Sequence, residues 1–190
     1  MNQQISEKYL KLLLEEGLGL DLSDPHLKGT PKRIAKMYHK EFFQNMTNEF
    51  DGYMLVHNSD NYNQIICSGK IEAVSTCAHH FLPFKFTAWL LYIPDRYIVG
   101  ASKPARLIEH YSKRPQTQEQ LCHQIIKNFD EKVEPKGTMI FINGTHDCMQ
   151  CRGVNQKHSD FSTSAISGAF TNPELELKGY EIIKISMGSN

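Results

Sequence analysis

The chain lacks several features that would assign a protein to a class at once. No apolar stretch approaches the roughly 20 residues that cross a bilayer, and the leucines of the first 20 residues are followed by acids without a small-residue cleavage site. We therefore expect neither a membrane span nor a signal peptide. With 21 basic and 21 acidic side chains the formal net charge is zero, which gives no support to a nucleic-acid or acidic-membrane partner. Internal repeats and low-complexity tracts are also missing.

Cysteine is present, but in a number that argues against a disulfide framework. Five cysteines cannot all pair, and a chain of 190 residues with 40% hydrophobic content can bury a core without cross-links. A reducing compartment, the cytoplasm, is the expected location. Cysteines in such a compartment are buried, metal-bound or reactive, and Cys67 and Cys122 fit the first description as small apolar side chains in a core.

The hydrophobic pattern divides the chain into two parts. Residues 1–62 are predicted to form an N-terminal helical region, because Tyr9, Leu10, Leu13 and Leu14 share one helical face. A second helix is predicted where Thr30 is followed by a proline at the first helical position.

Residues 63–190 are predicted to form the domain that carries the chemistry. Its segments are two strand patterns, then two helical patterns, then two further strand patterns, namely QIICSGKIEAVSTC, FKFTAWLLYIP, SKPARLIEHYSKR, TQEQLCHQIIKNFDEKV, GTMIFINGTHDCMQ and HSDFSTSAISGAF. This order predicts an α+β fold with an antiparallel sheet and helices on one face. Such a sheet has open edges, so we expect a homo-oligomer in which the sheet continues between subunits.

Two short motifs carry metal-ligand spacing. Cys77 and His80 form a Cys-x-x-His pair, and Cys148 and Cys151 form a Cys-x-x-Cys pair. If all four bind, the site is closed and structural. If only one of the second pair binds, three protein ligands leave a position for water, which is the catalytic arrangement. The residues alone leave both readings open.

Other polar side chains cluster around these motifs in the sequence. His79 and His146 lie beside the candidate ligands and could carry protons near neutral pH. Lys103 and Arg106 share a face at a predicted helix start and, with Arg152, could bind a polyphosphate, although a solvated basic face explains the first two equally well.

Three further residues are weaker candidates. Gln118 and Glu119 open the next predicted helix, and an amide beside a carboxylate can bind an amidine-like edge such as that of guanine. Acidic residues are also common at helix starts for electrostatic reasons alone. Ser102 is most simply a helix N-cap.

These motifs, in the order in which they occur, make the sequence resemble GTP cyclohydrolase I, the zinc enzyme that converts GTP and water to 7,8-dihydroneopterin triphosphate and formate. The matching segments span nearly the whole chain: TPKRIAKMY, STCAHHFLPF, GASKPARLIEHYSKRPQTQEQL, HDCMQCRG and TSAISGAF. The resemblance implies a tunnelling fold for residues 63–190, a four-stranded antiparallel sheet with two helices on one face. It also implies a decamer of two stacked pentamers with active sites between subunits.

Carried over by position, the resemblance implies a role for each candidate. The zinc ligands would be Cys77, His80 and Cys148. His146 would exchange a proton with the imidazole ring of guanine, and His79 would lie near the ribose or the attacked carbon. The remaining contacts would be made to the guanine edge by Gln118 and Glu119, to the triphosphate by Lys103, Arg106 and Arg152, and near the ribose by Ser102.

Two positions depart from the family pattern. Ala78 stands where the family usually has glutamate, which removes a charge beside the metal-binding turn but none of the three ligands. Cys151 falls where the family places no ligand, and a free thiol there could compete for the metal or be oxidised.

Two alternatives remain open at the level of sequence. One is an oxidoreductase of the same fold, an NADPH-dependent nitrile reductase, which would need a free nucleophilic cysteine. The other is a non-catalytic homologue with a closed site of three cysteines and one histidine. The sequence also leaves open whether the product feeds folate, biopterin or 7-deazaguanine synthesis.

Overall fold

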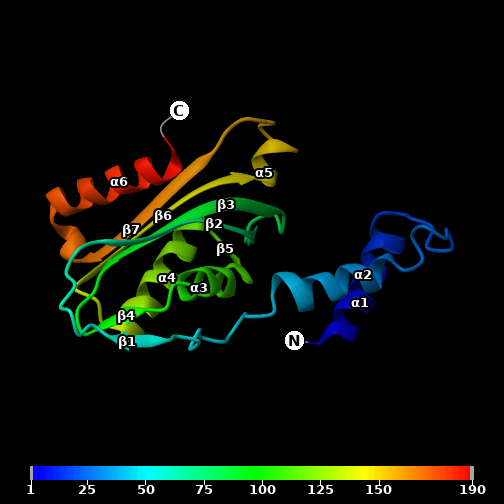
Figure 1. The fold of residues 1–190 in the computed structure, drawn as a ribbon. Helices are drawn as coiled ribbons and strands as arrows, with labels where there is room; N and C mark the ends of the chain where they lie inside the picture. Colours follow the sequence, from blue (N-terminus) through cyan, green and yellow to red (C-terminus); the bar gives the residue numbers. More distant parts are fainter. Residues whose placement is uncertain (1, 189–190) are drawn as a thin grey trace.

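The computed structural model describes residues 2–188. The elements follow in the order α1 (Gln3–Leu12), η1 (Leu13–Gly17), α2 (Thr30–Met37), η2 (Tyr38–Phe42), β1 (Leu55–His57), β2 (Ile66–Cys77), β3 (Pro83–Ile93), β4 (Tyr97–Val99), α3 (Lys103–Ser112), β5 (Pro115–Gln116), α4 (Gln118–Val133), β6 (Gly137–His146), α5 (Asp147–Gln150), β7 (Phe161–Gly168), η3 (Ala169–Thr171) and α6 (Pro173–Met187) (Figure 1).

The main sheet has the strand order β5-β2-β3-β6-β7. The four long strands pair antiparallel, as the sequence predicts, and only the two-residue β5 adds in parallel, beside Thr76 and Cys77. Sequential strands meet directly because β2 and β3 are joined by a short turn, while the helix pair α3 and α4 covers the crossover to β6. The predicted α+β fold is confirmed.

Alternation along β3 sends its side chains to two different cores. Phe84 and Leu90 face α3 and α4, where they pack with the buried stripe of α4 that the sequence pattern predicts: Leu121, Ile125, Phe129 and Val133. Trp89 and Leu91 point the other way and pack beneath α6. Both faces of the strand are therefore buried, which explains why FKFTAWLLYIP is mostly apolar rather than strictly alternating.

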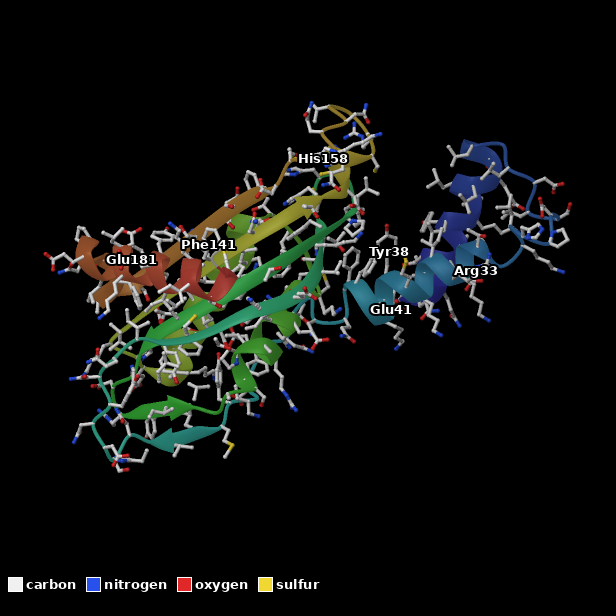
Figure 2. The ribbon with its side chains drawn as sticks, turned by 45° about the horizontal axis from the view of Figure 1, so that its top comes forward. Arg33, Tyr38, Glu41, Phe141, His158 and Glu181 are labelled. Carbon is white, nitrogen blue, oxygen red and sulfur yellow. The ribbon has the colours of Figure 1, made fainter. Side chains whose placement is uncertain are left out.

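The helix α6 was not predicted from the sequence, and it lies on the face opposite α3 and α4 (Figure 1). Figure 2 shows Phe141 beneath this helix, and its ring meets Tyr180 edge-on with centroids 6.2 Å apart. The pattern was hard to recognise because only Gly179 and Ile183 are buried in α6, while Ile185 is 74% exposed. The helix is held by Ile183, by the partly buried Leu175, Tyr180 and Ile182, and by a bond from Trp89 Nε1 to Ser186 Oγ at 3.1 Å.

The N-terminal helices project from one end of the sheet domain (Figure 1). Tyr38 lies where they join it (Figure 2), stacking on Phe43 and donating a hydrogen bond to the carbonyl of Phe81 at 3.3 Å. The region 1–62 is not wholly helical, because β1 lies in it and pairs with β4 from the second part. Within the described residues, none of the helices has both the length and the apolar character of a membrane span.

Candidate active site

The two ligand motifs meet at one end of the sheet, where β2 and β6 finish and β3 begins. Ser75 pairs with Phe84 across β2 and β3, and Phe84 pairs with His146 across β3 and β6. Cys77 follows at the end of β2, and Cys148 follows His146 in the short helix α5. The strand register therefore places side chains from distant parts of the sequence at the same end of the sheet.

One ligand atom from each of Cys77, His80 and Cys148 lies within 4.8 Å of the others. The turn between β2 and β3 sets the position of two of them. It is closed by hydrogen bonds from Cys77 N to Leu82 O and from Phe81 N to Cys77 O, both at 2.9 Å. Two thiols and one imidazole converging in this way form a group that could hold a metal ion.

A bound metal would change the protonation of Cys148. Burial, followed by the neighbouring Cys77 thiol, raises the pKa of Cys148. A cation bound between the two sulfurs would reverse that preference by stabilising the thiolates. Metal binding at this group should therefore release protons.

Cys151 does not join the group. Its side chain is exposed, and its thiol donates a hydrogen bond to the carbonyl of Asp147 at 2.9 Å. In the described residues the metal-binding group has three members, as the open-site reading requires, and the closed site of three cysteines and one histidine is not formed.

A cavity of about 270 Å³ opens beside the three ligands. It is lined by Cys77, His79, His80, Gln116, Thr117, Gln118, Glu119, His146, Cys148, Met149 and Phe161. The sequence-predicted residues His79, His146, Gln118 and Glu119 are therefore brought together with the metal-binding group. The exposed His79 also lies close to it, with its Nδ1 atom 3.7 Å from Cys77 Sγ.

His146 is held between two aromatic rings. Phe84 stacks on it with centroids 4.6 Å apart and planes 6° from parallel, and Phe161 meets it edge-on at 5.6 Å. Burial lowers the pKa of His146, while the charges of Glu119 and Asp147 oppose this shift. The net direction favours a neutral imidazole, the form that can both accept and donate a proton.

Gln118 and Glu119 owe their place to a capping box at the start of α4. Thr117 Oγ1 accepts from Gln120 N at 3.2 Å, and Gln120 Oε1 accepts from Thr117 N at 3.0 Å. The helix therefore begins at the cavity wall. Glu119 is exposed there, whereas Gln118 is buried, with only 1% of its surface accessible.

The structure does not bring Ser102, Lys103 or Arg106 to this cavity. These residues lie at the start of α3, directly after β4, where Val99 N bonds to Tyr92 Oη at 3.0 Å. Tyr92 is eight residues along β3 from Phe84, a distance of roughly 26 Å. Figure 1 shows β4 and α5 at opposite ends of the sheet.

Ser102 and Arg152, two other predicted residues, lie outside the cavity wall. Ser102 occupies the N-cap position of α3, but its side chain makes no capping hydrogen bond. Arg152 is exposed after α5 and is not part of the cavity wall. Sequence reasoning also missed Phe84 and Phe161, which carry no chemical signature and acquire a role only because the strand register places them against His146.

Comparison with known proteins identifies the family. The family model described as GTP cyclohydrolase I matches residues 5–184. The chain belongs to the GTP cyclohydrolase I family. GTP cyclohydrolase 1 of Wigglesworthia glossinidia brevipalpis is 37% identical over 168 residues, 88% of this chain and 77% of that protein. GTP cyclohydrolase 1 of Flavobacterium johnsoniae is 34% identical over 175 residues, 88% of this chain and 76% of that protein.

A solved structure, that of the archaeosine synthase QueF-Like in the apo form, is a more distant likeness. It has a TM-score of 0.46 and 14% identity over 55% of this chain and 94% of that chain. Membership of the GTP cyclohydrolase I family makes the protein an enzyme of the hydrolase class. Its sheet β2-β3-β6-β7 with α3 and α4 on one face is the tunnelling fold expected for that family.

Proposed function

We propose that this member of the GTP cyclohydrolase I family is a zinc enzyme that converts GTP and water to 7,8-dihydroneopterin 3'-triphosphate and formate. One observation supports this proposal more strongly than any other. The ligand atoms of Cys77, His80 and Cys148 converge within 4.8 Å, in the wall of a cavity that also holds His79 and His146. Metal ligands and proton carriers thus face one space large enough for part of a nucleotide.

The donor set fits zinc better than a hard cation. Thiolate and imidazole ligands suit Zn²⁺, whereas Mg²⁺ and Ca²⁺ take oxygen ligands. Three protein ligands leave a fourth position for water. When bound, zinc would lower the pKa of that water towards neutrality and polarise an oxygen of the substrate.

The protein's own residues would do the remaining work at the purine. His146, held against Phe84, would exchange a proton with the imidazole ring of guanine as that ring opens. The exposed His79 would lie on the substrate side of the ligands, near the ribose or the attacked carbon. Glu119 would accept the ring N–H and amino hydrogens of guanine, with Gln118 beside it in the cavity wall.

The triphosphate site would be completed by a neighbouring subunit. Lys103 and Arg106 carry the charge that a triphosphate needs, yet they lie at the far end of the sheet from Cys77 in the same chain, as does Ser102. A second copy could present its own α3 to the cavity, and Arg152, exposed beside α5, could contribute from the first.

The sheet edges support such an assembly. In the described part of the chain, β7 has no strand on its outer side, and β2 is covered on its outer side only at Thr76 and Cys77. Continuing the sheet between copies would satisfy these edges. We propose the arrangement implied for the family, a decamer of two stacked pentamers, located in the cytoplasm, where unpaired cysteines are stable.

The proposal is tested by product analysis. Purified protein is incubated with GTP, and the products are oxidised and dephosphorylated before fluorescence detection of neopterin. A neopterin signal that disappears after chelation and returns with zinc is expected. Release of phosphate or GDP without any neopterin would contradict the proposal, because it would show hydrolysis at the phosphates rather than at the purine.

A further inference from the structure

The side-chain amide of Gln118 is hydrogen-bonded inside the protein. Only 1% of its surface is accessible. Its Nε2 atom lies 3.2 Å from the carbonyl oxygen of Ile142, 2.9 Å from that of Phe161 and 3.0 Å from Thr163 Oγ1. Its Oε1 atom lies 3.0 Å from His146 Nε2. Both N–H groups of the amide and one of the two acceptor sites of its oxygen are therefore used inside the protein.

The two backbone carbonyls decide which way the amide points. A carbonyl oxygen can only accept a hydrogen bond, so the NH₂ group of Gln118 must face Ile142 and Phe161. The opposite orientation would set Gln118 Oε1 against two carbonyl oxygens with no hydrogen between them. The oxygen of Gln118 is therefore the atom that faces His146.

This orientation fixes the tautomer of the imidazole. Gln118 Oε1 carries no hydrogen, so the contact at 3.0 Å is a hydrogen bond only if His146 Nε2 carries one. A neutral imidazole has a single N–H group, which leaves Nδ1 of His146 as a bare acceptor. Nδ1 is thus the ring atom left free to exchange a proton.

The surroundings hold this arrangement in place. Phe84 and Phe161 restrict the ring of His146 from its face and its edge. Gly144 makes room for the amide, since a Cβ atom at that position would lie 2.9 Å from Gln118 Oε1 and 3.1 Å from the carbonyl oxygen of Lys85. Backbone, amide and imidazole are therefore fitted to each other before any substrate arrives.

We propose that Gln118 is a positioning residue that fixes His146 as the Nε2–H tautomer, so that Nδ1 is the atom through which His146 exchanges protons with the substrate. The inference rests on the proposed function for the identity of that substrate. It assigns Gln118 an action through His146 in place of a direct bond to the guanine edge, which is left to Glu119. His146 then takes up and gives back its proton at Nδ1, while Nε2 stays bonded to Gln118.

The tautomer can be read in the resting protein. Nitrogen NMR of the whole, histidine-labelled protein separates protonated from bare ring nitrogens, and the signals of His146 are identified by their loss in His146→Asn. At an alkaline pH, where the imidazole is neutral, we expect protonated Nε2 and bare Nδ1 in the wild type, and loss of that fixed pattern in Gln118→Met. The opposite tautomer, or an even mixture of the two in the wild type, would overturn the proposal without any use of GTP.

Asn128→Leu is the matched control for this measurement. Asn128 is also buried, with 3% of its surface accessible, and its Nδ2 atom bonds to the carbonyl of Phe50. Its Oδ1 atom accepts from Tyr53 Oη rather than from a histidine, and Asn128 is not part of the cavity wall. This variant should lose stability to a similar extent as Gln118→Met while the His146 signals stay unchanged. If both variants change those signals equally, the effect is general loosening and the proposal fails.

Kinetics separate a positioning role from substrate binding. Since acid–base catalysis contributes about 10²- to 10⁴-fold, we expect Gln118→Met to lower kcat by about tenfold to a hundredfold with little change in KM. In a His146→Ala background the same substitution should have almost no further effect, because the residue through which it acts is gone. An increase in KM with kcat unchanged, or an equal loss in both backgrounds, would show direct contact with substrate and overturn the proposal. A wild type without activity on GTP would instead count against the proposed function.

Discussion

The sulfur atoms of Cys77 and Cys148 lie 3.9 Å apart, although 71 positions separate them in the sequence. The strand order explains the contact, because β2 and β6 lie on either side of β3 and their last residues lie at the same end of the sheet. A separation of this size lets both sulfurs bind one ion together with His80. The fold therefore turns two short local motifs into one site.

Substitution of the two cysteines of the second motif should separate their roles. Cys148→Ser is expected to weaken zinc binding by at least about a hundredfold. Loss of a residue that only hydrogen-bonds to a ligand costs about tenfold to a hundredfold, and loss of a ligand should cost more. Cys151→Ser should change little, since this thiol is exposed and bonds to the carbonyl of Asp147. Zinc per subunit, measured by elemental analysis after dialysis, gives the comparison. Equal losses in both variants would favour the closed four-ligand site.

Mixing two inactive variants should restore activity if the site is shared between subunits. Cys148→Ser removes a metal ligand, and Arg106→Ala removes a cation at the other end of the sheet. In a one-to-one mixed oligomer about a quarter of the interfaces would combine an intact cavity with an intact α3 from the neighbour. Co-expression with two different tags, followed by the neopterin assay, measures the recovery. A mixed oligomer as inactive as its parents would place the complete site within one chain.

The buried thiol of Cys122 should make the protein less stable at alkaline pH. Burial raises its pKa from 9.0 to about 11, so the folded state keeps a proton that the unfolded state releases. The resulting stabilisation, at most ~3 kcal/mol, is fully present below pH 9.0 and is lost as the pH rises towards about 11. Denaturant unfolding over this range should give a shallower decline for Cys122→Ala than for the wild type. Parallel curves for the two proteins would contradict the assignment.

Much of the fold could be predicted because the sequence carries strong local patterns. Apolar residues recur every four positions in α4 because one face of this helix packs against the core, and β3 is mostly apolar because both of its faces are buried. The structure confirms the predicted helix and the predicted strand. The structure brings Cys77, His80 and Cys148 together in a group that could hold a metal ion, while their role as zinc ligands, which the family resemblance implied, stays a prediction. The spacing of the motifs alone leaves open whether only one cysteine of the second motif or both Cys148 and Cys151 would bind the metal.

The remaining features depend on contacts that no local pattern records. The helix α6 has only Gly179 and Ile183 fully buried and packs otherwise through partly buried side chains, so its sequence shows little periodicity. Ser102 and Lys103 are separated from the cavity by the length of the sheet, which follows from the strand register and not from their own sequence. The burial of Gln118 likewise depends on carbonyls from β6 and β7, which lie distant in the chain.

The central claim is that a zinc ion held by Cys77, His80 and Cys148 supports hydrolysis of the purine ring of GTP. It is tested most directly by measuring formate released and GTP consumed in the same sample in which zinc per subunit is determined, as the metal is removed and added back. The account predicts one formate for each GTP consumed, at a rate proportional to bound zinc. Formate release that is independent of zinc content, or GTP consumption without formate, would contradict it.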